Sequence, residues 1–219
     1  MMEKLELSVS HLMDLLQCPL CFWLSQRGMG RPSRPLPGIL TQMDRVIKHY
    51  MNQFIEHPGG PTWFPFEIQR FVGCRKLEAL DDTSKVVLRG TPDAIAIGKD
   101  NRCYVVDYKT ASPKLETPEY YQLQLDAYAW LLEQNDFAPL GGAYLLYFSP
   151  LDSDISRRFF EFDVTAVRVE VNPKRIPPLL LRARNVLESR DPPPPSENCE
   201  WCAWRRKVRK FLSEFDADK

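Results

Sequence analysis

The chain has 219 residues, of which 44% are hydrophobic and 26% charged, and its 29 basic and 29 acidic side chains give a formal net charge of zero. This length and composition exclude wholesale disorder and predict one globular domain with a sizeable core. No apolar run approaches the roughly 20 residues that span a bilayer, and the first residues lack a secretory signal. We therefore expect a soluble, cytoplasmic protein that does not associate with membranes.

Two helices are expected first along the chain. One is capped by Ser8 or Ser10 and runs towards Trp23, because leucines recur there at helical spacing. The proline-rich segment 31–38 is predicted to be a loop, and the second helix is expected over 40–55. The inward face of this second helix is predicted to hold Met43, Val46, Ile47, Tyr50 and Phe54.

Strands follow, because the middle of the chain is rich in aromatic and β-branched residues. Three strands are predicted over 64–72, 85–98 and 102–110, the last two joined by a tight hairpin at 99–102. The remaining predicted elements are a helix over 120–134, strands over 143–149 and 157–164, a helix over about 178–189 and a stiff proline spacer at 192–195. This order predicts a single α/β domain over residues 1–219, with helices flanking a mixed sheet.

Two acids and a lysine lie on the two central predicted strands. Asp93 precedes an apolar run, and Asp107 and Lys109 are two residues apart on the next strand, so these two side chains share one face. Folding the strands about their hairpin sets Asp93 level with Asp107. Neighbouring carboxylates repel each other unless a lysine or a divalent cation compensates, and Mg²⁺ or Mn²⁺ prefers such oxygen ligands. The alternative interpretation is an Asp–Lys–Asp ion-pair network that holds no metal.

These residues resemble the signature of the PD-(D/E)XK nuclease superfamily. Pro92-Asp93 followed by Asp107-Tyr108-Lys109 resembles the acidic and lysine positions of that signature. The sequence from Gly90 to Asp93, the strand 106–110 and the stretch from Gln124 to Tyr128 resemble three motifs of the RecB-like branch, in the same order. The resemblance implies a restriction-endonuclease-like fold whose nuclease core lies at about 40–165.

The resemblance also implies roles for the matching residues. Asp93, Asp107 and the backbone carbonyl of Tyr108 would bind a catalytic Mg²⁺ or Mn²⁺. Lys109 would orient and help deprotonate the attacking water and would stabilise charge on the scissile phosphate.

Four further positions have weaker assignments. Gln124 and Tyr128 would hold the active-site strand or contact the nucleic-acid backbone, although a helix-surface amide and a core aromatic explain them equally well. RecB-like enzymes usually supply a histidine from an N-terminal helix as an extra metal ligand, and His49 lies on the predicted helix where one is wanted. Glu67 corresponds to an acid sometimes present before the first carboxylate. For His49 and Glu67 the alternative is a solvent-facing side chain.

Two C-x-x-C pairs, Cys18/Cys21 and Cys199/Cys202, lie near opposite ends of the chain. Two such pairs complete a tetrahedral S₄ site, and a metal is the better interpretation in a cytosolic protein, where structural disulfides are rare. The expected site joins segments 8–30 and 191–210. The resemblance to the CRISPR-adaptation nucleases of the RecB-like branch implies a [4Fe–4S] cluster there. Those relatives usually combine one N-terminal with three C-terminal cysteines, so the two-plus-two arrangement keeps Zn²⁺ as an alternative.

The sequence therefore predicts a metal-dependent deoxyribonuclease that hydrolyses phosphodiester bonds in single strands or at free ends, as an exonuclease does. Basic residues flank both cysteine pairs and are expected to form one positive patch suited to a phosphate backbone: Arg27, Arg31, Arg34, Arg205, Arg206, Lys207, Arg209 and Lys210. The alternative function is a catalytically idle nuclease fold that binds nucleic acid or acts as a scaffold with structural Zn²⁺. Protein partners in recombination, repair or CRISPR adaptation are compatible with either function.

Overall fold

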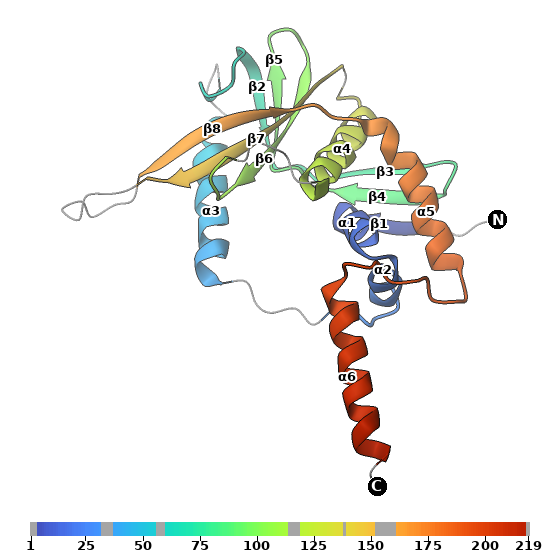
Figure 1. Ribbon diagram of the computed structural model, residues 1–219. Helices are drawn as coiled ribbons and strands as arrows, with labels where there is room; N and C mark the ends of the chain where they lie inside the picture. Colours follow the sequence, from blue (N-terminus) through green and yellow to red (C-terminus); the bar gives the residue numbers. More distant parts are fainter. Residues whose placement is uncertain are drawn as a thin grey trace.

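The computed structural model describes residues 4–31, 37–55, 60–113, 119–137, 139–151 and 161–217. Within them the chain forms a five-stranded sheet of order β2-β5-β6-β7-β8 and a three-stranded sheet of order β1-β4-β3 (Figure 1). The larger sheet holds β2 (Ile68–Gly73), β5 (Ala94–Gly98), β6 (Cys103–Lys109), β7 (Leu140–Pro150) and β8 (Phe162–Val169). The smaller sheet holds β1 (Leu5–Ser8), β3 (Leu77–Asp81) and β4 (Val86–Gly90).

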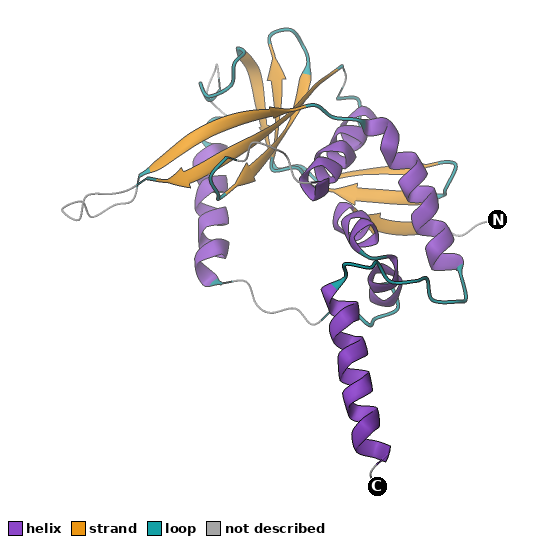
Figure 2. Ribbon diagram, in the orientation of Figure 1, coloured by secondary structure: helices purple, strands orange, loops and turns teal. Residues whose placement is uncertain are grey.

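Both sheets are mixed. β6 pairs with β7 in parallel and β1 pairs with β4 in parallel, whereas the other neighbouring strands are antiparallel. Helices flank the sheets (Figure 2), so the predicted restriction-endonuclease-like α/β architecture is confirmed, with two sheets in place of one. The helices are α1 (Val9–Gln17), α2 (Pro19–Ser25), α3 (Gly38–Asn52), α4 (Glu119–Glu133), α5 (Ile176–Glu188) and α6 (Glu200–Ala217), with a short 3₁₀ helix η1 (Pro173–Arg175).

α3 and α4 cover opposite faces of the larger sheet. Ile47 and Met51 of α3 lie in one buried cluster with Val106, whereas Leu123 of α4 lies in another cluster with Val105. Successive residues of β6 thus lie in different buried clusters, one on each face of the sheet, which explains why this strand is apolar on both faces.

The predicted inward face of α3 is wrong in part. Val46 is 55% exposed and Tyr50 is 41% exposed, whereas Ile47 and Met51 are buried. The helix is rotated by about one residue from the predicted orientation, because the pair four residues apart at 47 and 51 meets the sheet. Tyr50 instead contacts the rings of Phe54 and Trp63, with ring centroids 5.6 and 6.1 Å away.

The strand predicted over 85–98 is broken into two strands that belong to different sheets. β4 ends at Gly90 and β5 begins at Ala94, so Thr91, Pro92 and Asp93 connect the sheets. Proline lacks the N–H that a central strand needs, which accounts for a break at this point. α4 packs closely here, since a Cβ added to Gly90 would lie 2.7 Å from Leu131 of that helix.

Other predicted boundaries also change. The expected helix towards Trp23 is divided at Cys18, whose extended backbone precedes Pro19; Ser8 caps α1 as predicted, accepting from the His11 backbone N–H. β1, β3 and α6 were not among the predicted elements. The predicted loop 31–38 lies outside the described residues over 32–36, and the predicted strand 157–164 does so over 157–160. Among the described helices none is long and apolar enough to cross a membrane.

Candidate active site and thiol cluster

Asp93 and Asp107 lie side by side, as the hairpin predicts. Ala94 pairs with Val106 in the register of β5 and β6, which sets the preceding Asp93 level with Asp107. One carboxylate oxygen of Asp93, Oδ2, accepts a hydrogen bond from the backbone N–H of Tyr108 at 2.9 Å. The two acids therefore meet where the connection between the sheets crosses the carboxyl end of β6.

Lys109 links Asp107 to α4. Its ammonium forms an ion pair with Asp107 and lies 3.4 Å from Oε1 of Gln124. The Gln124 amide nitrogen in turn donates to the hydroxyl of Tyr128 at 3.2 Å. The predicted residues Asp107, Lys109, Gln124 and Tyr128 thus form one continuous polar chain, because positions 124 and 128 share a face of α4.

Sequence reasoning missed Lys48, which brings a second ammonium group to the acids. Lys48 Nζ lies 3.3 Å from Oδ1 of Asp93 and 2.9 Å from Oδ1 of Asp44. Asp44 and Lys48 are four residues apart on α3, a spacing at which opposite charges pair on a helix. That spacing is visible in the sequence, but only the packing of α3 shows that the pair reaches Asp93.

The other two candidate ligands lie differently. His49 follows Lys48 on α3 and its side chain is exposed. Glu67 is 75% exposed and forms an ion pair with Lys99 at 2.5 Å, at the end of β5 opposite to Asp93. The structure therefore does not bring Glu67 to the two aspartates.

Asp107 is the residue on which the electrostatics of the site depend. It is 3% exposed, and its Oδ2 atom takes no well-oriented hydrogen bond within the described part of the chain, only the ion pair with Lys109. Burial raises the pKa of Asp107 to about 6, against the lowering effect of the Lys109 ammonium and with the negative charge of Asp93 adding to the rise. A buried carboxylate with a free lone pair suits a divalent cation, which prefers oxygen donors. Such a cation would also relieve the repulsion between the Asp93 and Asp107 carboxylates.

The pKa of Lys48 moves so that its side chain stays charged. Burial acts to lower the pKa, but the hydrogen bond to Asp44 and the negative charge of Asp93 outweigh it, and the pKa is raised. Asp93, Asp107, Lys48 and Lys109 consequently form a compact group of two negative and two positive charges.

Comparison with known proteins identifies the family. The sequence profile of the PD-(D/E)XK nuclease superfamily matches residues 26–207, which include all the residues of the carboxylate site. The chain belongs to the PD-(D/E)XK nuclease superfamily. The match also covers Cys199 and Cys202 but begins after Cys18 and Cys21.

Two solved structures resemble this superfamily member over most of its length. The crystal structure of SSO0001 shares 18% sequence identity, with 87% of this chain and 80% of that chain covered and a TM-score of 0.42. A candidate exonuclease from Eubacterium rectale shares 13% identity, with 90% and 86% covered and a TM-score of 0.48. Among proteins with curated functions, none matches the sequence significantly.

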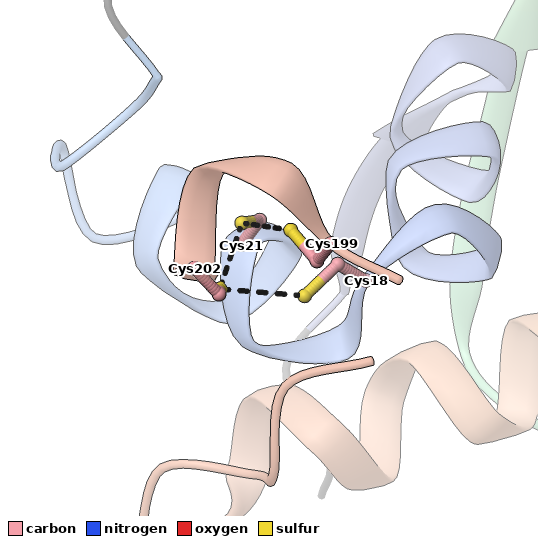
Figure 3. Close-up of side chains that lie close together, drawn as sticks. All are labelled: Cys18, Cys21, Cys199 and Cys202. Carbon is pink, nitrogen blue, oxygen red and sulfur yellow. Dashed lines mark hydrogen bonds between the residues drawn. The ribbon is translucent and has the colours of Figure 1, made fainter. Parts of the chain in front are cut away.

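The nuclease chain brings its four terminal cysteines together as predicted (Figure 3). Cys18 and Cys21 lie at the junction of α1 and α2, and Cys199 and Cys202 lie at the start of α6. All four are buried and their sulfur atoms lie within 4.8 Å of one another. This thiol cluster joins the two ends of the chain and can hold a metal.

The surroundings of the thiol cluster shift the pKa values of its members in opposite directions: burial raises those of Cys21 and Cys202, whereas that of Cys18 is lowered. Burial acts to raise the pKa of Cys18, but hydrogen bonds from the backbone of Cys21 and of Ser196 outweigh it and lower the pKa to about 7. Arg31 adds a positive charge, with Nη2 3.9 Å from Sγ of Cys199. Thiolates are the form of cysteine that binds metals, so a cation bound here would displace protons from the buried thiols.

Proposed function

We propose that the protein is a divalent-metal-dependent deoxyribonuclease that hydrolyses phosphodiester bonds at Asp93, Asp107 and Lys109. The observation that carries this proposal is the convergence of these three side chains at one end of β5 and β6, joined to α4 through Gln124. Within a superfamily of nucleases, this arrangement favours an active enzyme over a catalytically idle scaffold, since both acids and the lysine are present.

The carboxylates and the lysine would divide the chemistry. Asp93, Asp107 and the backbone carbonyl of Tyr108 would hold Mg²⁺ or Mn²⁺, which supplies an activated water and neutralises phosphate charge. His49 remains a candidate further ligand on α3. The Lys109 ammonium would orient the attacking water and stabilise negative charge on the scissile phosphate, and the Gln124–Tyr128 pair would keep this ammonium in place.

The substrate we propose is DNA presented as a single strand or a free end. Five exposed basic residues lie on α6, which extends away from the sheets (Figure 1): Arg205, Arg206, Lys207, Arg209 and Lys210. Trp201 and Trp204 are exposed on the same helix, with ring centroids 6.2 Å apart. Basic side chains next to accessible aromatic rings suit a strand whose bases can stack.

The predicted basic residues next to the N-terminal cysteines are less available for contact with DNA than those on α6. The Arg27 guanidinium stacks on Trp23 at 3.8 Å and donates to the backbone carbonyl of Leu187 at 2.9 Å. Arg31 contacts Gln17 and Cys199, and Arg34 lies outside the described residues. We therefore assign most of the contact with the DNA backbone to α6.

For the thiol cluster we propose a single Zn²⁺ rather than the [4Fe–4S] cluster that the resemblance implies. Three of the sulfur–sulfur separations are 3.8 Å for Cys18–Cys202, 3.7 Å for Cys21–Cys199 and 3.6 Å for Cys21–Cys202, and all of them are within 4.8 Å. A tetrahedral Zn²⁺ with Zn–S bonds of about 2.3 Å requires separations of about 3.8 Å. A four-iron cluster needs a wider cage, because each thiolate binds a different iron.

The direct test is cleavage of end-labelled single-stranded and double-stranded DNA by the purified protein with and without Mg²⁺ or Mn²⁺. We expect metal-dependent shortening from an end, and its loss in Asp107→Asn. Binding of DNA without any cleavage under every metal condition would instead support the idle scaffold. Equal cleavage by the Asp107→Asn variant would show a contaminating nuclease or a different active site.

A further inference from the structure

Lys48 pairs with the same carboxylate to which the proposed function assigns a metal ion. Its ammonium lies 3.3 Å from Asp93, and the Asp93 side chain is 18% exposed while that of Lys48 is 38% exposed. A protonated lysine has no lone pair and cannot be a metal ligand. Lys48 and a divalent cation therefore compete for Asp93.

The charge balance around the carboxylates makes this competition effective. Asp44, Asp93 and Asp107 carry only one negative charge more than Lys48 and Lys109 neutralise, so a divalent cation would leave the partly buried site with a net positive charge. An incoming phosphodiester supplies negative charge with which both the cation and the displaced Lys48 ammonium can pair. The affinity for the metal should therefore be higher when DNA is bound, and the affinity for DNA should be higher when the metal is bound.

We propose that Lys48 is a phosphate-binding residue that rests on Asp93 and moves to the scissile phosphate when DNA and metal bind. This inference rests on the proposed nuclease function and adds to it a DNA-dependent loading of the metal. Asp44 is suited to keep the ammonium near the site during the exchange, since it lies 2.9 Å from Lys48 and is itself 58% exposed. Lys109 cannot take this role, because its ammonium is held by Asp107 and Gln124.

The test is the affinity of the protein for Mn²⁺ in the absence of DNA, measured by titration calorimetry or by the Mn²⁺ electron paramagnetic resonance signal. Lys48→Met should bind Mn²⁺ about tenfold more tightly than the unmodified protein, since the competing charge is gone. Lys48→Arg keeps the charge and should bind Mn²⁺ as the unmodified protein does. Arg45→Met removes an exposed charge from the same helix and serves as the matched control.

The second measurement is turnover on single-stranded DNA at saturating Mn²⁺. Lys48→Met should lose about 100-fold in kcat although it binds the metal more tightly, and these opposite changes separate a phosphate-binding role from a structural one. Should Lys48→Met fail to fold, Lys48→Gln replaces it, with the same expectations.

The outcomes distinguish this inference from the proposed function. Unchanged or weaker Mn²⁺ binding by Lys48→Met would overturn the competition, and unchanged kcat would overturn the phosphate-binding role. If Asp107→Asn binds Mn²⁺ as well as the unmodified protein does, the metal site itself is misassigned and the proposed function fails first.

Discussion

Asp93 and Tyr108 are joined by a hydrogen bond of 2.9 Å between a side-chain carboxylate and a backbone N–H. The bond ties the connection between the two sheets to the active-site strand β6. It leaves the other oxygen of Asp93 facing Lys48, and it holds Asp93 level with Asp107. The two carboxylates are therefore held in place by the backbone of β5 and β6, so that the proposed movement of Lys48 leaves both acids aligned for a cation.

Replacement of Lys109 should abolish cleavage. We expect Lys109→Ala to lose at least 100-fold in kcat, because no other ammonium is placed between Asp107 and Gln124 in the described structure. Lys99→Ala is the matched control, since Lys99 pairs with Glu67 at the far end of β5. Metal-dependent cleavage retained by Lys109→Ala would refute the assigned role.

Replacement of Asp107 should stabilise the protein while inactivating it. Folding raises the pKa of Asp107 from its ordinary value of 3.8 to about 6, so the folded state favours the protonated form. Ionisation of Asp107 thus lowers the free energy of unfolding. This loss of stability grows between about pH 4 and about pH 6 and reaches its full size above about pH 6. Without added divalent cation, Asp107→Asn should raise the free energy of unfolding at pH 8 by on the order of 2 kcal/mol.

Denaturant unfolding of both proteins at pH 4 and pH 8 checks this dependence. The stabilisation by Asp107→Asn should fade at pH 4, where Asp107 of the unmodified protein is protonated. If Asp107→Asn is less stable than the unmodified protein at pH 8, the predicted stabilisation is wrong. The ion pair with Lys109 would then stabilise the fold by more than the burial of the carboxylate destabilises it.

The thiol cluster should contain one Zn²⁺ per chain. Metal analysis of protein purified without oxygen is expected to find zinc and no visible absorption. Cys202→Ser should lose the zinc and melt roughly 5–10 °C lower, because metal binding is coupled to folding. Cys74→Ser is the control, since Cys74 is exposed and lies outside the cluster. A brown protein with about four irons per chain would instead establish the [4Fe–4S] cluster.

Binding of DNA should depend on α6. The triple variant Arg205→Ala/Arg206→Ala/Lys207→Ala is expected to weaken single-strand binding about tenfold at moderate salt and to flatten its salt dependence, since fewer counterions are released. The exposed residue Arg182 on α5 provides a control substitution, Arg182→Ala. An unchanged affinity and salt slope in the triple variant would place the DNA path elsewhere.

The acidic pair and its lysine could be predicted because their positions follow from local patterns. A short hairpin fixes which residues of two strands are level, and strand alternation fixes which side chains share a face. Both rules hold for Asp93, Asp107 and Lys109. The helical spacing of Gln124 and Tyr128 likewise predicts that they lie together.

The second sheet and Lys48 could not be predicted, because both depend on contacts between distant segments. β1 pairs with β4, about eighty residues further along the chain, and no local pattern records that partner. The orientation of α3 depends on which pair of residues packs against the sheet, Ile47 and Met51 or Val46 and Tyr50. Both pairs are hydrophobic, so the sequence pattern does not choose between them. A rotation of one residue decides that Lys48 reaches Asp93.

A metal bound by the thiol cluster would give the linear chain some of the properties of a circular one. Cys18 and Cys202 lie 184 residues apart, and closing a loop of that length destabilises the unfolded chain by about 5 kcal/mol. The whole larger sheet, β3 and β4 of the smaller sheet, and the carboxylate site lie inside the closed loop, whereas β1 precedes it. With that metal bound, a single cut in an enclosed surface turn, such as residues 99–102, would leave two fragments joined through the thiol cluster.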